Sequence, residues 1–222
     1  MHKNINKNAF STYKGIHDGK TGIILATGPS LNYYDVATDL HKNSIIVGVN
    51  SIIFADPQYR LDYYFIQDNG TTDKGQKAYF RCKEIYDKYQ PDMQKFYGIN
   101  DNPLSKKKWY LTLKDCESGG ATPYTTNRRT MYKYTHELEK YTPGEGHSVI
   151  MTAIQFLIFT GVLTIYLVGV DSTGARVGET TCKNYNMTGW FKMKEWIDTL
   201  HGINIININP IGLIDLFEKY ND

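Results

Sequence analysis

Two glycine-containing turns in this sequence carry polar groups that could bind an anion. The first comprises Thr27, Gly28, Pro29 and Ser30, and it directly follows an apolar run at 22–26. Gly28 would let the backbone approach a ligand closely, and Ser30 could cap the next helix or hydrogen-bond a phosphate. The turn lacks the glycine spacing and the lysine of the known phosphate-binding loops, so both interpretations stay open.

The second turn ends at Gly146, His147 and Ser148, and it opens the most apolar helix expected in the chain. Backbone N–H groups at a helix N-terminus attract anions, and His147 could add a donor or a general base. Thr152 and Gln155 share a face of this helix with Ser148. The alternative is that Ser148 is an ordinary N-cap and His147 an ordinary surface histidine.

Polar residues also follow other expected strands. Asn50 and Ser51 follow the second strand, Gln67 and Asp68 the third, and Asp171 a later one. The two aspartates could bind a metal, orient a ribose or act as bases, or each could simply cap a loop. Ligands of open parallel sheets bind outside the carboxyl ends of the strands, so we expect these residues near the two turns.

Several common catalytic motifs do not occur in the sequence. It holds no Asp-x-Asp pair, which argues against the usual manganese site of metal-dependent glycosyltransferases. It also has no HExxH, no GxSxG and no recognisable Cys/His/Asp pattern. A hydrolase is therefore not favoured.

Short β-branched runs alternate with helical segments along the chain. We expect strands at 22–26, 44–49, 62–66, 94–97, 109–113, 163–168 and 203–208. We expect helices at 32–41, 77–89, 130–141, 147–160, 189–201 and 211–220, and a Gly/Thr-rich loop at 114–127. This alternation predicts the α/β class, with a Rossmann-like, doubly wound, mostly parallel sheet and helices on both faces.

The composition is that of one compact domain over residues 1–222. The chain is 41% hydrophobic, and its 25 Lys+Arg against 23 Asp+Glu give a net charge of +2, which does not favour nucleic acid as a partner. Its three cysteines have no CxxC spacing, so neither a disulfide framework nor a zinc site is expected. The start of the chain lacks the apolar core of a signal peptide, and we expect a cytoplasmic protein.

The uncharged run at 149–170 is long enough for a membrane span. Its scattered polar residues, Gly161 and its β-branched second half favour a buried helix followed by a buried strand. We therefore expect no transmembrane segment.

Three blocks of the sequence resemble those of a known family. They are GIILATGPSL at 22–31, IIVGVNSIIFAD at 45–56 and GHSVIMTAIQFLIFTGVLTIYLVGVDSTG at 146–174. Their order and spacing resemble those of the bacterial lipooligosaccharide sialyltransferases. The archaeal 6-hydroxymethylpterin diphosphokinase-like proteins share that scaffold.

The resemblance to the sialyltransferases implies a glycosyltransferase that moves a sugar from a CMP-activated donor to a glycan or lipid-linked acceptor without a metal. No other cofactor is implied. Acceptor recognition would fall to the range 70–130, as an insertion or lid. Gln67 and Asp68, at the polar end of the third expected strand, are further candidate site residues. The nucleotide-binding residues it implies are Thr27, Gly28, Pro29, Ser30, Asn50, Ser51, Gly146, Ser148 and Asp171.

The catalytic base is expected to be His147, with Glu145 and Tyr185 as alternatives. The family places its histidine base in the loop after the Gly-x-Asp strand. Here that loop offers Tyr185 and has no histidine before His201.

Two other interpretations stay open. The diphosphokinase-like resemblance implies that Asp68 and Asp171 handle ATP and magnesium for pyrophosphoryl transfer to a small hydroxyl acceptor. The other is a nucleotide- or sugar-binding module without catalysis. The oligomeric state is open under all three.

Overall fold

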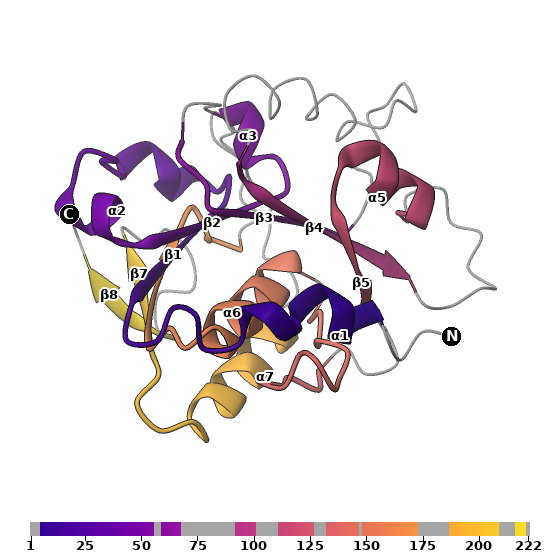
Figure 1. Cartoon of the computed structure of the whole chain (residues 1–222). Coiled ribbons are helices and arrows are strands. Elements are labelled where there is room, and N and C mark those ends of the chain that lie inside the picture. The colour runs from indigo at the N-terminus through magenta and orange to yellow at the C-terminus, as the bar shows by residue number, and fades with distance from the viewer. Residues whose placement is uncertain are drawn as a thin grey trace.

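The computed structural model describes residues 5–55, 59–67, 92–100, 111–126, 132–146, 148–172, 187–208 and 216–220. These residues build one sheet of eight strands (Figure 1). The strands are β1 (Thr21–Leu25), β2 (Ile45–Val49), β3 (Tyr63–Ile66), β4 (Gln94–Asn100), β5 (Thr122–Thr126), β6 (Thr164–Val168), β7 (Asn204–Ile208) and β8 (Glu218–Tyr220). Each neighbouring pair is parallel, in the order β5-β4-β3-β2-β1-β6-β7-β8. The chain therefore has the expected α/β, Rossmann-like fold.

The direction in which the sheet grows reverses between β1 and β6. From β1 the chain adds β2 to β5 outward on one side, and it then returns to place β6 on the other side of β1. Loops diverge at such a reversal, and ligands of this fold class bind there, outside the carboxyl ends of the strands. We call this side of the sheet the carboxyl edge and the opposite side the amino edge.

Helices cover both faces of the sheet (Figure 1). One face carries α2 (Asp39–Asn43), α3 (Ile52–Ala55) and α5 (Leu113–Gly119), and the other carries α1 (Ile5–Phe10), α6 (Val149–Phe159) and α7 (Thr188–Ile197). Short 3₁₀ helices, η2 (Ser11–Tyr13) and η3 (Pro29–Tyr33), follow α1 and β1. Successive side chains of a strand point to opposite faces. Ile24 accordingly joins the core beneath α6 and α7, whereas Ile23 and Leu25 join the core on the other face.

A group of packed aromatic rings holds α6 against the sheet. The ring of Phe156 on α6 lies 5.1 Å from that of Phe65 on β3 and 5.3 Å from that of Phe96 on β4. Phe10 on α1 packs on the same group, 5.4 Å from Phe96. Because interiors this closely packed resist shifts of their elements, the position of α6 is set by these rings.

The uncharged run at 149–170 folds as α6 followed by β6, in agreement with the sequence. None of the described helices has the length and apolar character needed to cross a membrane.

The expected loop at 114–127 and the expected strand at 109–113 are wrong over their described parts, 114–126 and 111–113. Residues 113–119 are α5, which begins with a capping box in which Asp115 N donates to Thr112 Oγ1 (3.2 Å) and Thr112 N donates to Asp115 Oδ2 (2.8 Å). Gly120, at φ +59°, ends the helix, and β5 follows directly. Of the expected strand, Leu111 forms only an isolated bridge with Ile99. The described parts of the range 70–130 thus include two strands of the main sheet.

The helix expected at 130–141 is also wrong over its described part. Residues 132–141 form turns, because side chains bind the backbone groups that a helix would pair. Thr135 Oγ1 accepts from Glu137 N (3.0 Å), and Thr135 N donates to Gln155 Oε1 (2.9 Å).

Two further helices differ from expectation. The segment at 32–41 is split between η3 and α2. The N-cap of α2 is Thr38, whose side chain accepts a hydrogen bond from His41 N. The closing helix at 211–220 is wrong at its end, where residues 218–220 form β8 beside β7. The helix expected at 77–89 lies outside the described residues.

Candidate functional site

The turn after β1 and the turn after β6 lie against each other at the reversal point. Gly28 N donates to Gly169 O (2.7 Å), and Ser30 N donates to the Asp171 carboxylate (2.7 Å). The second of these bonds joins residues 141 positions apart. The structure therefore brings together two of the sequence segments that were predicted to form the site.

Glycine is required at two positions by this close approach. A Cβ built on Gly28 would overlap the Gly169 carbonyl oxygen and lie 2.5 Å from Asp171 Oδ2. A Cβ on Gly169, whose φ is +67°, would overlap the Ala26 carbonyl oxygen. The close approach of the turn after β6 is therefore sufficient reason for glycine at position 28, where the sequence predicted the approach of a ligand.

Ser30 and Asp171 are both almost fully buried, with 1% and 2% of their surfaces exposed. The Asp171 carboxylate accepts the Ser30 amide, so that amide is not available to a phosphate, and the negative charge would repel one. Ser30 Oγ is buried and has no hydrogen-bond partner among the described residues. The turn is thus better suited to a hydroxyl group, such as that of a ribose, than to a phosphate.

Polar residues at the end of β2 lie beside the same turn. Thr27 Oγ1 and Ser51 Oγ are within hydrogen-bonding distance of each other at 3.3 Å. Asn50 has φ +49°, and β3 holds it there: Asn50 N donates to Phe65 O (3.1 Å), and the Tyr64 hydroxyl donates to Asn50 O. Both bonds use the backbone of Asn50, which leaves its carboxamide for other contacts.

The turn before α6 is held firmly by its neighbours. Gly146 has φ +48°, and a Cβ there would lie 2.6 Å from the Tyr134 hydroxyl. That hydroxyl donates to Gly189 O (2.8 Å), at the start of α7. Ser148 is the N-cap of α6, because its Oγ accepts from Ile150 N (3.3 Å). His147, between these two residues, lies outside the described residues.

Gln155, on the helix face predicted to carry ligand contacts, serves the structure instead. Its Oε1 accepts from Thr135 N (2.9 Å) and Gly144 N (3.1 Å), and its Nε2 donates to Gly144 O (2.7 Å) and Met151 O (2.8 Å). A fully buried carboxamide with four partners fixes the turn before α6.

A second group of polar side chains lies at the carboxyl edge, between β3, β5 and α6. Gln67 Nε2, just after β3, donates to Thr152 Oγ1 in the first half of α6 (2.8 Å). Burial raises the pKa of Tyr124 and the charge of Glu145 adds to this, while hydrogen bonding from Gln67 and Thr152 opposes it. We call these four residues the Gln67 cluster. Tyr124 was not among the predicted site residues, because its segment was expected to be a loop and is β5.

Glu145 is 8% exposed, and its charge acts on Tyr124, which places its carboxylate near the Gln67 cluster. The other two candidates for the catalytic base, His147 and Tyr185, lie outside the described residues, as does Asp68. Within the described ranges no three His, Cys, Asp or Glu side chains lie together in a way that could hold a metal ion.

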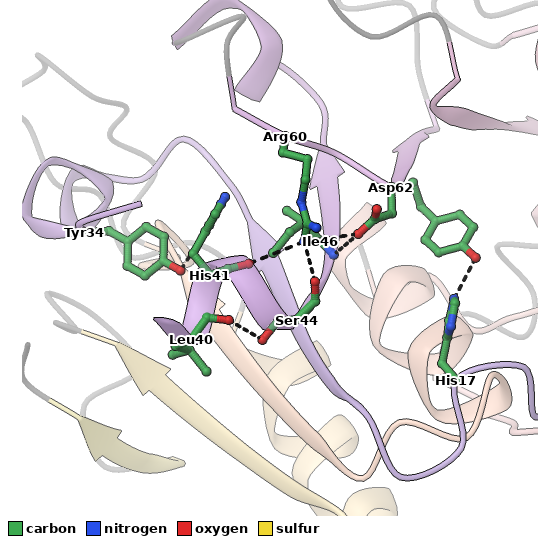
Figure 2. A network of polar contacts seen from close by, with 9 residues as sticks. His17, Tyr34, Leu40, His41, Ser44, Ile46, Arg60 and Asp62 are labelled. Atoms are coloured by element: carbon green, nitrogen blue, oxygen red, sulfur yellow. Dashed lines mark hydrogen bonds and ion pairs between the residues drawn. The ribbon is translucent and has the colours of Figure 1, made fainter. Parts of the chain in front are cut away.

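A separate polar network closes the amino edge (Figure 2). Arg60 donates to Ser44 O (2.5 Å) and His41 O (3.4 Å) at the end of α2, and it lies 3.6 Å from Asp62. Asp62 accepts from Ile46 N (2.7 Å) at the start of β2. These contacts join α2, β2 and β3, and the polar groups of Arg60 and Asp62 are thereby engaged in holding the structure together.

Two histidines take part at this edge. His17 Nε2 and the Tyr63 hydroxyl are 2.7 Å apart, and His41 Nδ1 lies 3.3 Å from the Tyr34 hydroxyl. Burial, reinforced by the charge of Lys20, lowers the pKa of His17. Burial, reinforced by Arg60, lowers the pKa of His41.

Fold and site together define a Rossmann-like α/β protein whose polar residues gather where the sheet reverses. Comparison with known proteins adds no family to this description: no protein-family model matches the chain, and no curated protein matches it.

Proposed function

We propose that this chain is a sialyltransferase-like glycosyltransferase that transfers a sugar from a CMP-activated donor to a glycan or lipid-linked acceptor. The observation that best supports this is the bond from Ser30 N to Asp171, which joins the first and third of the blocks that resemble that family. The contact of Thr27 with Ser51 adds the second block. The three blocks thus converge at the point where this fold class binds ligands.

The charges at the site favour one orientation of the nucleotide. The carboxylate of Asp171 faces the turn after β1, which suits the ribose, and Asn50 directly precedes Ser51, which contacts Thr27 in that turn. The phosphate is then best placed at the start of α6, whose N-terminal dipole stabilises negative charge. In this orientation the leaving group gains its stabilisation as the glycosidic bond breaks.

The reaction is a direct displacement. The acceptor oxygen forms a bond to the anomeric carbon, the bond from that carbon to the phosphate oxygen breaks, and CMP leaves with the electron pair. A base removes the proton of the acceptor hydroxyl. His147 is the first candidate for that base. Glu145, which is buried, is the one candidate that lies within the described residues.

A thermal-shift screen tests the donor class. Purified protein is measured with CMP, CMP-sialic acid, CDP, UDP, GDP and ATP, each with and without magnesium. A ligand at one hundred times its Kd stabilises the native state by about 2.7 kcal/mol, which corresponds to a rise in Tm of roughly 5–10 °C for a chain of this size. We expect the CMP compounds to give this rise without magnesium. A rise only with ATP and magnesium would contradict the proposal.

Turnover identifies the base. Release of CMP from CMP-sialic acid with an oligosaccharide acceptor is followed by mass spectrometry for the wild type, His147→Ala and Glu145→Gln. The variant that lacks the base should lose about 10²-fold or more in kcat, with little change in affinity for CMP. A variant with unchanged kcat removes its residue from the mechanism.

A further inference from the structure

The Gln67 cluster contains a buried hydroxyl that the proposed reaction does not use. Tyr124 is fully buried on β5, and its ring packs 5.7 Å from Phe10 and 5.8 Å from Phe65. Its hydroxyl lies 3.5 Å from Ile66 O, the last residue of β3. Burying a hydroxyl costs free energy unless it is hydrogen-bonded, so the Tyr124 hydroxyl and its partners hold one another in place.

Those partners fix the orientation of one amide. Gln67 Nε2 donates to Thr152 Oγ1 at 2.8 Å, across 85 positions of sequence. Gln67 and Thr152 both lower the pKa of Tyr124 as hydrogen-bonding neighbours, and the Tyr124 hydroxyl donates to Ile66 O, the residue directly before Gln67. Because the amide is planar and its nitrogen is bound to α6, its oxygen is turned away from Thr152. Gln67 is only half-buried, whereas Thr152 and Tyr124 are fully buried.

The cluster also lies next to the proposed nucleotide site. Gln67 directly follows β3, and the same strand holds the backbone of Asn50 through Phe65 O. Thr152 lies about one turn beyond Ser148, the N-cap of α6. A ligand between the end of β2 and the start of α6 would therefore pass over Gln67.

We propose that Tyr124 is a positioning residue that, together with Thr152, holds Gln67 so that its amide oxygen accepts a hydrogen bond from a hydroxyl or amino group of the bound nucleotide-sugar. This inference rests on the proposed function. It adds a specificity-determining contact whose geometry is set in part from β5, a strand outside all three blocks of the resemblance.

Calorimetric titration with CMP and CMP-sialic acid tests the inference on wild type, Tyr124→Phe, Gln67→Ala and the double variant. Tyr124→Phe keeps the ring between Phe10 and Phe65, so the core stays filled. The matched control is Tyr63→Phe, which removes a hydroxyl bound to His17 at the amino edge.

We expect Tyr124→Phe to weaken binding of at least one of these ligands about tenfold and Tyr63→Phe to leave it unchanged. If Tyr124 acts through Gln67, the double variant should bind no more weakly than Gln67→Ala alone. If Tyr124 had a purely structural role, Tyr124→Phe would lower Tm, and its effect on binding would add to that of Gln67→Ala. Thr152→Val, which removes the other partner of Gln67, should weaken binding in the same way and serves if Tyr124→Phe does not fold.

The alternative outcomes separate the two proposals. Wild-type affinity in both Tyr124→Phe and Thr152→Val, or a loss that adds fully to that of Gln67→Ala, overturns the positioning role and leaves the proposed function intact. A folded wild-type protein that binds neither CMP nor CMP-sialic acid overturns the proposed function and this inference with it.

Discussion

The contact between the turns after β1 and β6 predicts a large difference between two glycine-to-alanine substitutions. Gly169 and Gly202 both have left-handed backbones, with φ +67° and +80°. A Cβ on Gly202 would have no neighbour within 4 Å among the described residues, whereas one on Gly169 would overlap Ala26 O and lie 2.8 Å from its carbonyl carbon. Of these two glycines, only Gly169 therefore combines backbone strain with overlap.

The magnitudes follow from these two terms. Left-handed backbone strain costs alanine about 1 kcal/mol at either position, and forced overlap in a packed interior adds about 1–3 kcal/mol. Gly202→Ala should thus lower the free energy of unfolding by about 1 kcal/mol and Gly169→Ala by about 3 kcal/mol. For a chain of this size the difference corresponds to roughly 4–8 °C in Tm.

Urea denaturation followed by circular dichroism measures both variants. Equal losses of unfolding free energy would refute the reasoning, because they would show that the turn after β6 does not press against Ala26. A loss at Gly202 larger than that at Gly169 would refute it more strongly.

Three other predictions concern single side chains. Ser30→Ala removes a buried hydroxyl without a partner among the described residues, so urea denaturation should show a stability within about 0.5 kcal/mol of wild type, while calorimetry should show weaker binding of CMP. Arg60→Gln should lower the free energy of unfolding by about 1 kcal/mol, because the carbonyls of His41 and Ser44 lose their shared donor. The same substitution should raise the pKa of His41 in an NMR titration, and an unchanged pKa would contradict the role of Arg60. The pKa values of His17 and His41 are lowered in the folded state, so the unfolded chain binds protons more readily and stability should fall as the pH drops below about 6.5. His17→Asn should reduce the difference in urea midpoint between pH 7.5 and 5.5, and an unaltered difference would exclude His17 as a source.

The regular parts of the fold could be predicted because their signals are local. Apolar runs rich in β-branched residues predict β1, β2, β6 and β7, and an aromatic run predicts β3. Gly161 separates the helix and the strand of the charge-free run at 149–170. Two available signals were not used. Thr112 and Asp115 have the spacing of a capping box, and Pro123 is compatible with β5 because that strand lies at the border of the sheet.

The candidate site could be predicted only at the level of its segments. Neighbouring parallel strands end at the same edge of the sheet, so the polar residues that follow β1, β2, β3 and β6 must lie near one another. Their individual partners depend on contacts between distant segments. Nothing local in the sequence pairs Ser30 with Asp171 or Gln67 with Thr152. For the same reason, the sequence alone could not predict that the Asp171 carboxylate lies beside Ser30 and disfavours a phosphate there.

The central claim is that a CMP-containing ligand binds at the carboxyl edge. The measurement that tests it most directly is a titration of ¹⁵N-labelled protein with CMP, followed by two-dimensional NMR. We predict that the amides of Ser30, Asn50, Gln67 and Thr152 shift together, with one Kd, while that of His41 at the amino edge stays in place. Shifts centred on the amino edge, or no shifts at millimolar CMP, would contradict the account.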